Sequence, residues 1–293
     1  MQSRFSSLWG KKKPKFAEQF QPKDGKIFLP EAAIICTPRG GTSSLYYNMR
    51  EHPKFFPRDL IKESYILSWS WGEDAKALPR IKSTFEHPVG TFNIEGSPGD
   101  LSYPMAAEQI WNLNPNQKFI AMFRDPVIRA HENFWLVVKG REETVSTFRE
   151  AVALEESRLK GGMDSLLTGD ETQVRNCRLY PYLERGKYVK HLKKWLKYFP
   201  QEQFLFIKSE DYFENSQQVL DQVCDFIGVE RFTPKKIVHW WDAIVSKEDA
   251  HGQWPVGVLD PDLAKSLYDL FRPYNEELSR LLGRDFTWEF NSK

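Results

Sequence analysis

The chain has 293 residues, of which 41% are hydrophobic and 14% aromatic, so it can bury the core of one large α/β domain and is not globally disordered. Its formal net charge of +1 argues against a protein that coats nucleic acid, although a local basic cleft is compatible with that value. Three widely spaced cysteines and six scattered histidines show neither a disulfide framework nor a metal-ligand pattern, so we expect no metal.

The first 27 residues predict a disordered basic tail. They contain the run KKKPK and no apolar core of a signal peptide. No window elsewhere approaches the roughly 20 apolar residues that a membrane-spanning helix needs. We therefore expect a cytoplasmic protein without a membrane span, in which residues 28–293 form the folded domain.

A strand, a tight loop and a helix are predicted next. The apolar run Ala32 to Cys36 predicts the strand, and an amphipathic segment from Leu45 predicts the helix. The loop between them consists of Thr37, Pro38, Arg39, Gly40, Gly41, Thr42, Ser43 and Ser44. Backbone N–H groups at a helix N-terminus, small glycines, hydroxyl donors and a guanidinium predict a cradle for phosphate or sulfate. An ordinary Pro-Gly turn before a helix is the alternative.

The remaining elements alternate between strand and helix patterns. Short apolar runs predict buried strands, amphipathic runs predict helices, and Gly228 and Gly283 predict helix ends. The predicted strands are KFIAMF at 118–123 and Phe204 to Ile207, and the predicted helices are RDPVIRAHENFWLVV, residues 188–199, SQQVLDQVCDFIGV and the segment after Asp260. This alternation predicts a single α/β domain with a central parallel β-sheet flanked by helices.

The loop differs from the phosphate-binding loop of ATP-dependent kinases and NTPases. That loop has the pattern GxxxxGK[ST], in which a Lys and a hydroxyl follow the glycines. Here the cation, Arg39, precedes the glycines, and no GK[ST] is present. A P-loop-like ATP-dependent kinase is therefore kept only as an alternative.

Several segments together resemble sulfotransferases that use 3′-phosphoadenylyl sulfate (PAPS), most closely the heparan sulfate sulfotransferase type. The loop resembles Lys-x-Gly-Thr-Thr, and FNIEGSP resembles Glu-Lys-Ser/Thr-Pro. HPKFFPRDLIKESYIL resembles His-Pro … Lys-Glu-x-His-Phe-Phe, and RGKYVKHLKKWLKYF resembles Gly-x-Tyr-x-x-His-Leu-x-x-Trp-Leu-x-x-Phe. The matching segments span about residues 30 to 290, and the resemblance implies a P-loop-like fold.

The resemblance also implies roles for the transfer of the sulfonate group. Glu95 would be the general base, and Lys62 would position the sulfonate or balance its charge. Arg39 would hold the 5′-phosphosulfate together with Gly40, Gly41, Thr42, Ser43 and Ser44. Arg39 stands where the family usually has Lys, which changes a point-like cation into a planar fork.

A second implied site binds the 3′-phosphate of the nucleotide. Arg124 follows a buried strand in a segment that resembles Arg-Asp-Pro-x-x-Arg-Ala-x-Ser-x-Tyr. Glu132 stands where this pattern has Ser, and a carboxylate repels phosphate. Either Glu132 turns away and Asn133 takes over, or the site is altered. Further candidates for binding the cofactor are Tyr182 and Arg185, and Lys247 and His251 in a polar loop.

The resemblance therefore predicts a sulfotransferase that moves a sulfonate from PAPS to a hydroxyl or amine and releases adenosine 3′,5′-bisphosphate. The acceptor would be a small molecule or a carbohydrate, and no nucleic acid is expected as a partner. Besides the kinase, a non-catalytic nucleotide-binding protein on the same fold stays as an alternative. The sequence leaves the acceptor and the oligomeric state open.

Overall fold

The computed structural model describes residues 14–56, 62–65, 77–239 and 258–290. Its strands are β1 (Lys26–Ile27), β2 (Ala32–Ile35), β3 (His87–Pro88), β4 (Ile94–Gly96), β5 (Lys118–Phe123) and β6 (Phe204–Lys208). Its α-helices are α1 (Thr42–Met49), α2 (Ala77–Phe85), α3 (Ala106–Leu113), α4 (Pro126–Lys139), α5 (Phe148–Arg158), α6 (Ser165–Thr168), α7 (Glu171–Leu179), α8 (Tyr188–Trp195), α9 (Ser209–Glu214), α10 (Ser216–Ile227) and α12 (Pro261–Leu282). Short 3₁₀ helices are η1 (Ala17–Phe20), η2 (Asp100–Ser102), η3 (Glu184–Gly186) and η4 (Gln201–Gln203).

A four-stranded parallel sheet forms the centre of the fold, as the alternation of strands and helices predicts. The strand order is β4-β2-β5-β6, and every neighbouring pair in it is parallel. Ala33 pairs with Glu95 on one side and with Phe119 on the other. The carboxyl ends of β2, β4 and β5 therefore lie at one edge of the sheet, where ligands bind in open α/β folds.

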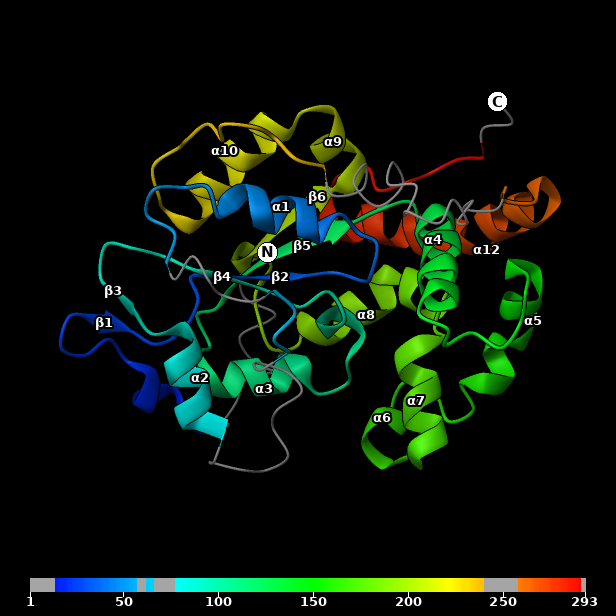
Figure 1. The fold of residues 1–293 in the computed structure, drawn as a ribbon, viewed down its shortest axis with the longest axis horizontal. Coiled ribbons are helices and arrows are strands. Elements are labelled where there is room, and N and C mark those ends of the chain that lie inside the picture. Colours follow the sequence, from blue (N-terminus) through cyan, green and yellow to red (C-terminus); the bar gives the residue numbers. More distant parts are fainter. Residues whose placement is uncertain (1–13, 57–61, 66–76, 240–257, 291–293) are drawn as a thin grey trace.

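Both faces of the sheet are covered by helices, as Figure 1 shows. Along β2 and β5, alternate side chains enter two different hydrophobic cores because successive side chains of a strand point to opposite faces. Ala33, Ile35, Phe119, Ala121 and Phe123 pack with residues of α2, α3 and α8. Ala32, Ile34, Ile120 and Met122 pack with residues of α1, α9 and α10 on the other face. The sheet is thus the middle layer of three.

Helices α4, α5, α7 and α12 lie beside the sheet, at the right of Figure 1. A third core joins α4, α5 and α12 through Phe134, Phe148 and Phe271. Helix α4 begins directly after β5, with Asp125 as its N-cap and Pro126 at its first position. This short connection places the first two turns of α4 beside the ligand-binding edge of the sheet.

Several predicted boundaries are confirmed. Strand β5 has the predicted bounds, and α12 is capped by the Asp260 side chain and followed by Gly283 with a φ of 65°. Gly228 ends α10 with a φ of 84°, a left-handed conformation that glycine adopts without strain. The first helix begins at Thr42, three residues before Leu45, because Gly41 already turns the chain as its N-cap.

The predicted tail extends too far into the chain. Residues 14–27 include η1 and β1, and β1 pairs with β3 in an antiparallel ribbon. Phe20 is buried in the core that contains α2 and α3, and it anchors this segment to the fold. One buried aromatic side chain in a polar stretch carries too little periodicity to be recognised from the sequence.

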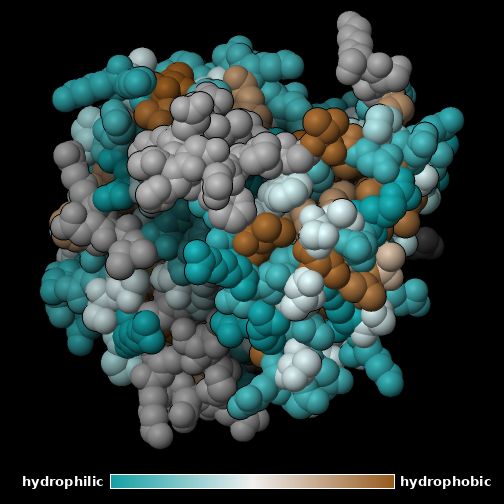
Figure 2. Space-filling model, turned by 45° about the vertical axis from the view of Figure 1, so that its right-hand side comes forward, coloured by the Kyte–Doolittle hydropathy of each residue, from teal (hydrophilic) through white to brown (hydrophobic). Residues whose placement is uncertain are grey.

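Among the residues that the structure describes, no helix is both long and apolar enough to cross a membrane. On the face drawn in Figure 2, hydrophobic side chains occur in separate small groups among hydrophilic ones.

Candidate active site

The loop after β2 is held by hydrogen bonds to its carbonyl groups. Arg129 donates to the carbonyl of Pro38 at 3.4 Å, Arg124 donates to that of Arg39 at 2.9 Å, and Ser209 Oγ donates to that of Gly40 at 2.7 Å. These donors come from α4, the end of β5 and the start of α9. The N-cap of α1 is Gly41, which has no side chain to cap the first helical turn. The helix N-terminus therefore presents backbone N–H groups to a ligand.

The two glycines of the loop serve different purposes. Gly41 has a φ of 85°, and a methyl group added there would lie 3.0 Å from the ring of Phe213. A methyl group added to Gly40 would lie 2.2 Å from Cys36 Sγ, so this glycine is required by packing beneath the loop. Gly40 is buried and is not among the residues that line the pocket above the loop, whereas Gly41 is.

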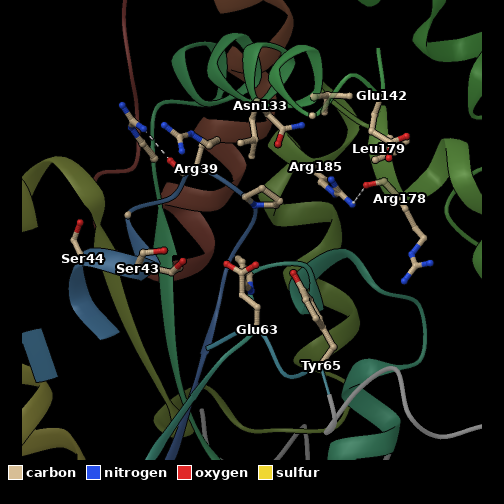
Figure 3. Close-up of a pocket in the computed structure, with 18 of the residues that line it drawn as sticks. Arg39, Ser43, Ser44, Glu63, Tyr65, Asn133, Glu142, Arg178, Leu179 and Arg185 are labelled. Atoms are coloured by element: carbon tan, nitrogen blue, oxygen red, sulfur yellow. Dashed lines mark hydrogen bonds between the residues drawn. The ribbon is translucent and has the colours of Figure 1, made fainter. Parts of the chain in front are cut away.

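A pocket opens above this loop, with a volume of about 330 Å³. Its walls come from the loop and α1, the segment 63–65, the end of β5, α4 and the end of α7. They include the predicted binding residues Arg39, Gly41, Thr42, Ser43, Ser44, Arg124 and Asn133. In Figure 3, Glu63 and Tyr65 point into the pocket from the side opposite Asn133, and Arg178 and Arg185 lie at its far end. The fold thus brings the predicted anion loop and a carboxylate into one cavity.

Glu132 does not turn away from the cations of the pocket. Arg124 binds the Glu132 carboxylate with both terminal nitrogens, at 2.6 Å and 2.8 Å. Arg39 Nε lies 3.6 Å from the same carboxylate. Burial raises the pKa of Glu132 and lowers that of Arg39, while their mutual attraction opposes both effects. Of the two arrangements that the sequence left open, the structure shows the altered site.

Asn133 faces the pocket one residue after Glu132. Its side chain is 3% exposed, and its Nδ2 has no hydrogen-bond partner among the described residues. Leaving a buried amide N–H unpaired costs about 1–3 kcal/mol, so an unpaired amide in the wall of a cavity is a candidate for a ligand contact. Asn133 thus lines the pocket, and its binding role stays a prediction.

The segment 62–65 runs across the end of β4. Glu63 N–H donates to the carbonyl of Gly96 at 3.0 Å, and Tyr65 N–H donates to Ser97 Oγ at 3.0 Å. Glu63 and Tyr65 have φ values of 65° and 50°, and Arg39 has a φ of 73°. Three of the five non-glycine residues with positive φ in the described chain therefore line this pocket. Strained backbone of this kind clusters at functional sites.

Two carboxylates near the pocket differ in access. The Glu63 side chain is 47% exposed, lines the pocket, and forms an ion pair with Lys62 Nζ at 2.5 Å. Glu95 is 0% exposed on β4 and does not line the pocket; it accepts hydrogen bonds from Ser64 and Ser97. Burial raises the pKa of Glu95. The sequence placed Glu63 in a Lys-Glu pair but gave it no role, because only the folded chain shows which carboxylate reaches the cavity.

The far end of the pocket carries two arginines, Arg178 and Arg185, of which only Arg185 is a candidate from the sequence. Arg185 is 5% exposed, and it donates to the carbonyl of Arg178 at 3.0 Å. Burial lowers the pKa of Arg185 to about 10. Arg178 belongs to the last turn of α7, and Arg185 belongs to η3. Arg178 lies in no segment whose pattern points to a ligand, so only the folded chain shows that it contributes to this wall.

The remaining predicted residues do not reach the pocket or lie outside the described chain. Lys62 is buried and reaches the pocket only through its ion pair with Glu63. Tyr182 is fully buried in the core of α4 and α5, and its hydroxyl donates to Glu143, so its predicted contact with the nucleotide is wrong. Lys247 and His251 lie outside the described residues. Within the described part of the chain, no cluster of three or more His, Cys, Asp or Glu side chains could hold a metal ion.

Three comparisons relate this geometry to known proteins. The mouse heparan sulfate glucosamine 3-O-sulfotransferase 3A1 is 27% identical over 91% of this chain, which spans 66% of that protein's length. The human heparan sulfate glucosamine 3-O-sulfotransferase 3B1 is 25% identical over 94% of this chain and 69% of its own length. A crystal structure of a sulfotransferase from Alicyclobacillus acidocaldarius covers 87% of this chain and 96% of its own, with a TM-score of 0.66 and 26% identity.

The family comparison covers the loop, the sheet and every described wall of the pocket. The profile of the sulfotransferase domain matches residues 29–249, which include β2, segment 62–65, β5, α4 and α7. A match over most of the chain, together with the shared P-loop-like α/β fold, leads to one conclusion: this chain belongs to the sulfotransferase domain family.

Proposed function

We propose that this chain transfers a sulfonate group from PAPS, or a closely related adenylyl sulfate, to a hydroxyl or amine of a small-molecule or carbohydrate acceptor. The observation that carries the proposal is that one pocket is lined both by the loop after β2 and by Glu63 on the opposite side. An anion site and a proton acceptor on opposite sides of one cavity are what an in-line displacement at sulfur requires.

The loop would bind the phosphosulfate and stabilise the leaving group. The N-terminus of α1, the hydroxyls of Thr42 and Ser43 and the guanidinium of Arg39 all border the pocket. As the bond between sulfur and the bridging oxygen breaks, the electron pair stays on the nucleotide phosphate. Donors fixed around that phosphate favour the transition state because the negative charge grows there. Adenosine 3′,5′-bisphosphate would be the product when PAPS is the donor.

Glu63 is better placed than Glu95 to act as the base. The acceptor oxygen or nitrogen forms its new bond to sulfur as its proton passes to a carboxylate. Glu63 borders the cavity, whereas Glu95 is buried behind segment 62–65 and accepts a hydrogen bond from the Ser64 hydroxyl. We therefore assign the base to Glu63. Glu95 is assigned the role of positioning segment 62–65. Lys62 is assigned the role of balancing the charge of Glu63.

The acceptor side of the pocket has mixed charge. Glu63 and Glu142 line it together with Arg178 and Arg185, beside the apolar Leu136 and Leu179. The relatives act on heparan sulfate glucosamine, as their names state. A wall with both signs of charge favours an acceptor of low net charge over a long polyanion, because like charges on the wall and the polymer repel. A sugar or a small amphiphilic molecule fits this wall best.

The proposal is tested by following a labelled sulfonate. The full chain is incubated with a panel of sugars, phenols and amines and with ³⁵S-labelled PAPS or adenosine 5′-phosphosulfate. We expect label on at least one acceptor without added metal. Mg-ATP with γ-³²P label serves as the comparison for the kinase alternative. Transfer of phosphate and not of sulfonate would favour the kinase, and nucleotide binding without any transfer would favour the non-catalytic alternative.

A further inference from the structure

The cations at the end of β5 are already paired inside the protein. Both terminal nitrogens of Arg124 bind Glu132, and Arg39 Nε lies 3.6 Å from the same carboxylate. Together Arg124, Arg39 and Glu132 carry a net charge of +1, and the buried Arg129 adds a further cation within electrostatic reach of the same carboxylate. The phosphosulfate in the loop of Arg39 uses that charge, because oxyanions bind most strongly to charged donors.

A second phosphate on the nucleotide would meet the same corner. Arg124 directly follows β5, the strand beside β2, and its Nη1 also donates to the carbonyl of Arg39 at 2.9 Å. The ribose of a nucleotide whose 5′ end lies in the loop is therefore expected beside Arg124 and Asn133, both of which line the pocket. A phosphate dianion there would lie close to the buried Glu132 carboxylate. At an effective dielectric near 20, such repulsion weakens binding by about tenfold or more.

A hydroxyl group suits these side chains better than a phosphate. Asn133 lines the pocket with a neutral side-chain amide, and its Nδ2 has no hydrogen-bond partner among the described residues. The ion pair of Arg124 and Glu132 is neutral as a unit, and its oxygens and N–H groups suit a hydroxyl, which both donates and accepts. A neutral hydroxyl adds no charge beside the ion pair of Arg124 and Glu132, so its binding leaves no buried charge without a partner.

We infer that this pocket takes the 3′ position of the donor ribose as a hydroxyl, and that Glu132 is the residue that removes the preference for a 3′-phosphate. The inference rests on the proposed function and defines its donor more closely. Adenosine 5′-phosphosulfate is bound at least as well as PAPS, and Asn133 contacts the 3′-hydroxyl.

Three nucleotides that differ only at the 3′ position test this inference by calorimetric titration of the full chain. They are adenosine 5′-monophosphate, 3′-deoxyadenosine 5′-monophosphate and adenosine 3′,5′-bisphosphate. We expect the 3′-hydroxyl form to bind at least as tightly as the bisphosphate. The 3′-deoxy form should bind about fivefold more weakly, since one hydrogen bond is lost. A wild-type preference of tenfold or more for the bisphosphate overturns the inference and leaves the sulfotransferase proposal intact.

Substitution of Glu132 tests whether this carboxylate is what disfavours a 3′-phosphate on the nucleotide. In Glu132→Ser the bisphosphate should bind about tenfold more tightly, while the affinity for the monophosphate changes less than about threefold. Glu132→Gln keeps the size of the side chain and should show the same direction if the serine variant does not fold. Equal changes for both nucleotides, or no change for either, overturn the inference.

A matched control removes a carboxylate elsewhere in the same pocket. Glu142 lines the far end, where it pairs with Arg175 at 2.6 Å. Glu142→Gln should leave the ratio of the two affinities unchanged, and a shift as large as that of Glu132→Gln contradicts the inference. If neither nucleotide binds the folded wild type or the folded Glu132 variants, the nucleotide pocket itself is refuted and the proposed function falls with it.

Discussion

The two sides of the pocket are built in different ways. The anion side is one continuous piece of chain, in which β2, the loop and α1 follow one another within 18 residues, from Ala32 to Met49. The opposite side is segment 62–65, which is held in place by hydrogen bonds to Gly96, Ser97 and Glu95 at the end of β4. The proposed anion site can therefore be recognised from local sequence, whereas the choice of the proposed base depends on contacts between distant segments.

The largest expected effect distinguishes Glu63 from Glu95, the two carboxylates on the side of the pocket formed by segment 62–65 and the end of β4. Glu63→Gln should lower kcat by about a hundredfold or more with little change in KM for the donor, because it removes the proton acceptor and keeps the side-chain volume. Steady-state kinetics with an established acceptor measures this effect. Glu95→Gln serves as the matched variant and should lower kcat by less than about tenfold. The reverse order of effects returns the base to Glu95.

The next effect tests the anion side. Arg39→Ala should lower kcat/KM by about a hundredfold, because a charged donor at the phosphosulfate is lost and Glu132 keeps only Arg124 as a close partner. Arg39→Lys should retain activity within about tenfold of wild type, since it keeps the charge but not the planar fork. Equal activity of the alanine variant and the wild type would exclude Arg39 from donor binding. Circular dichroism checks that the variants remain folded.

A smaller effect concerns the stability of the protein as a function of pH, to which the buried carboxylate of Glu95 contributes. Burial raises the pKa of Glu95 above its unfolded value, so the folded state binds the proton more tightly than the unfolded state. Stability is then lost as the pH rises through the unfolded pKa toward the folded pKa. Glu95→Gln should therefore melt at a higher temperature than wild type at pH 8, and the difference should vanish at pH 3.5. A lower melting temperature at pH 8 would show that the carboxylate stabilises segment 62–65 through its charge.

The smallest effect tests the position of Tyr182. Tyr182→Phe removes the hydroxyl that donates to Glu143 and should cost about 1 kcal/mol of unfolding free energy, measured by denaturant titration. The affinity for adenosine 5′-monophosphate should not change, because this ring lies in the core of α4 and α5. A weaker affinity for the nucleotide without a loss of stability would restore the binding role that the sequence suggested.

The hydrophobic patterns predicted the larger elements of the fold well, and the physical reason is their length and burial. Strand β5 is a six-residue run with five buried side chains, and α12 has a capping Asp, an initial Pro and a final Gly. Strand β4 has only three residues, and α5 has a buried face of only three side chains within a charged segment. Such short or weakly periodic elements acquire their structure from the partners that they pack against.

The sequence by itself determined the family, the loop proposed to bind an anion and the presence of a carboxylate at position 132. These depend on the order and spacing of residues that lie close together in the chain. Only the tertiary structure decided that Glu132 pairs with Arg124 and Arg39, that Glu63 reaches the cavity while Glu95 is buried, and that Arg178 and Arg185 form its far end. Burial and charge pairing are properties of the whole packed chain, because each depends on side chains that are distant in the sequence.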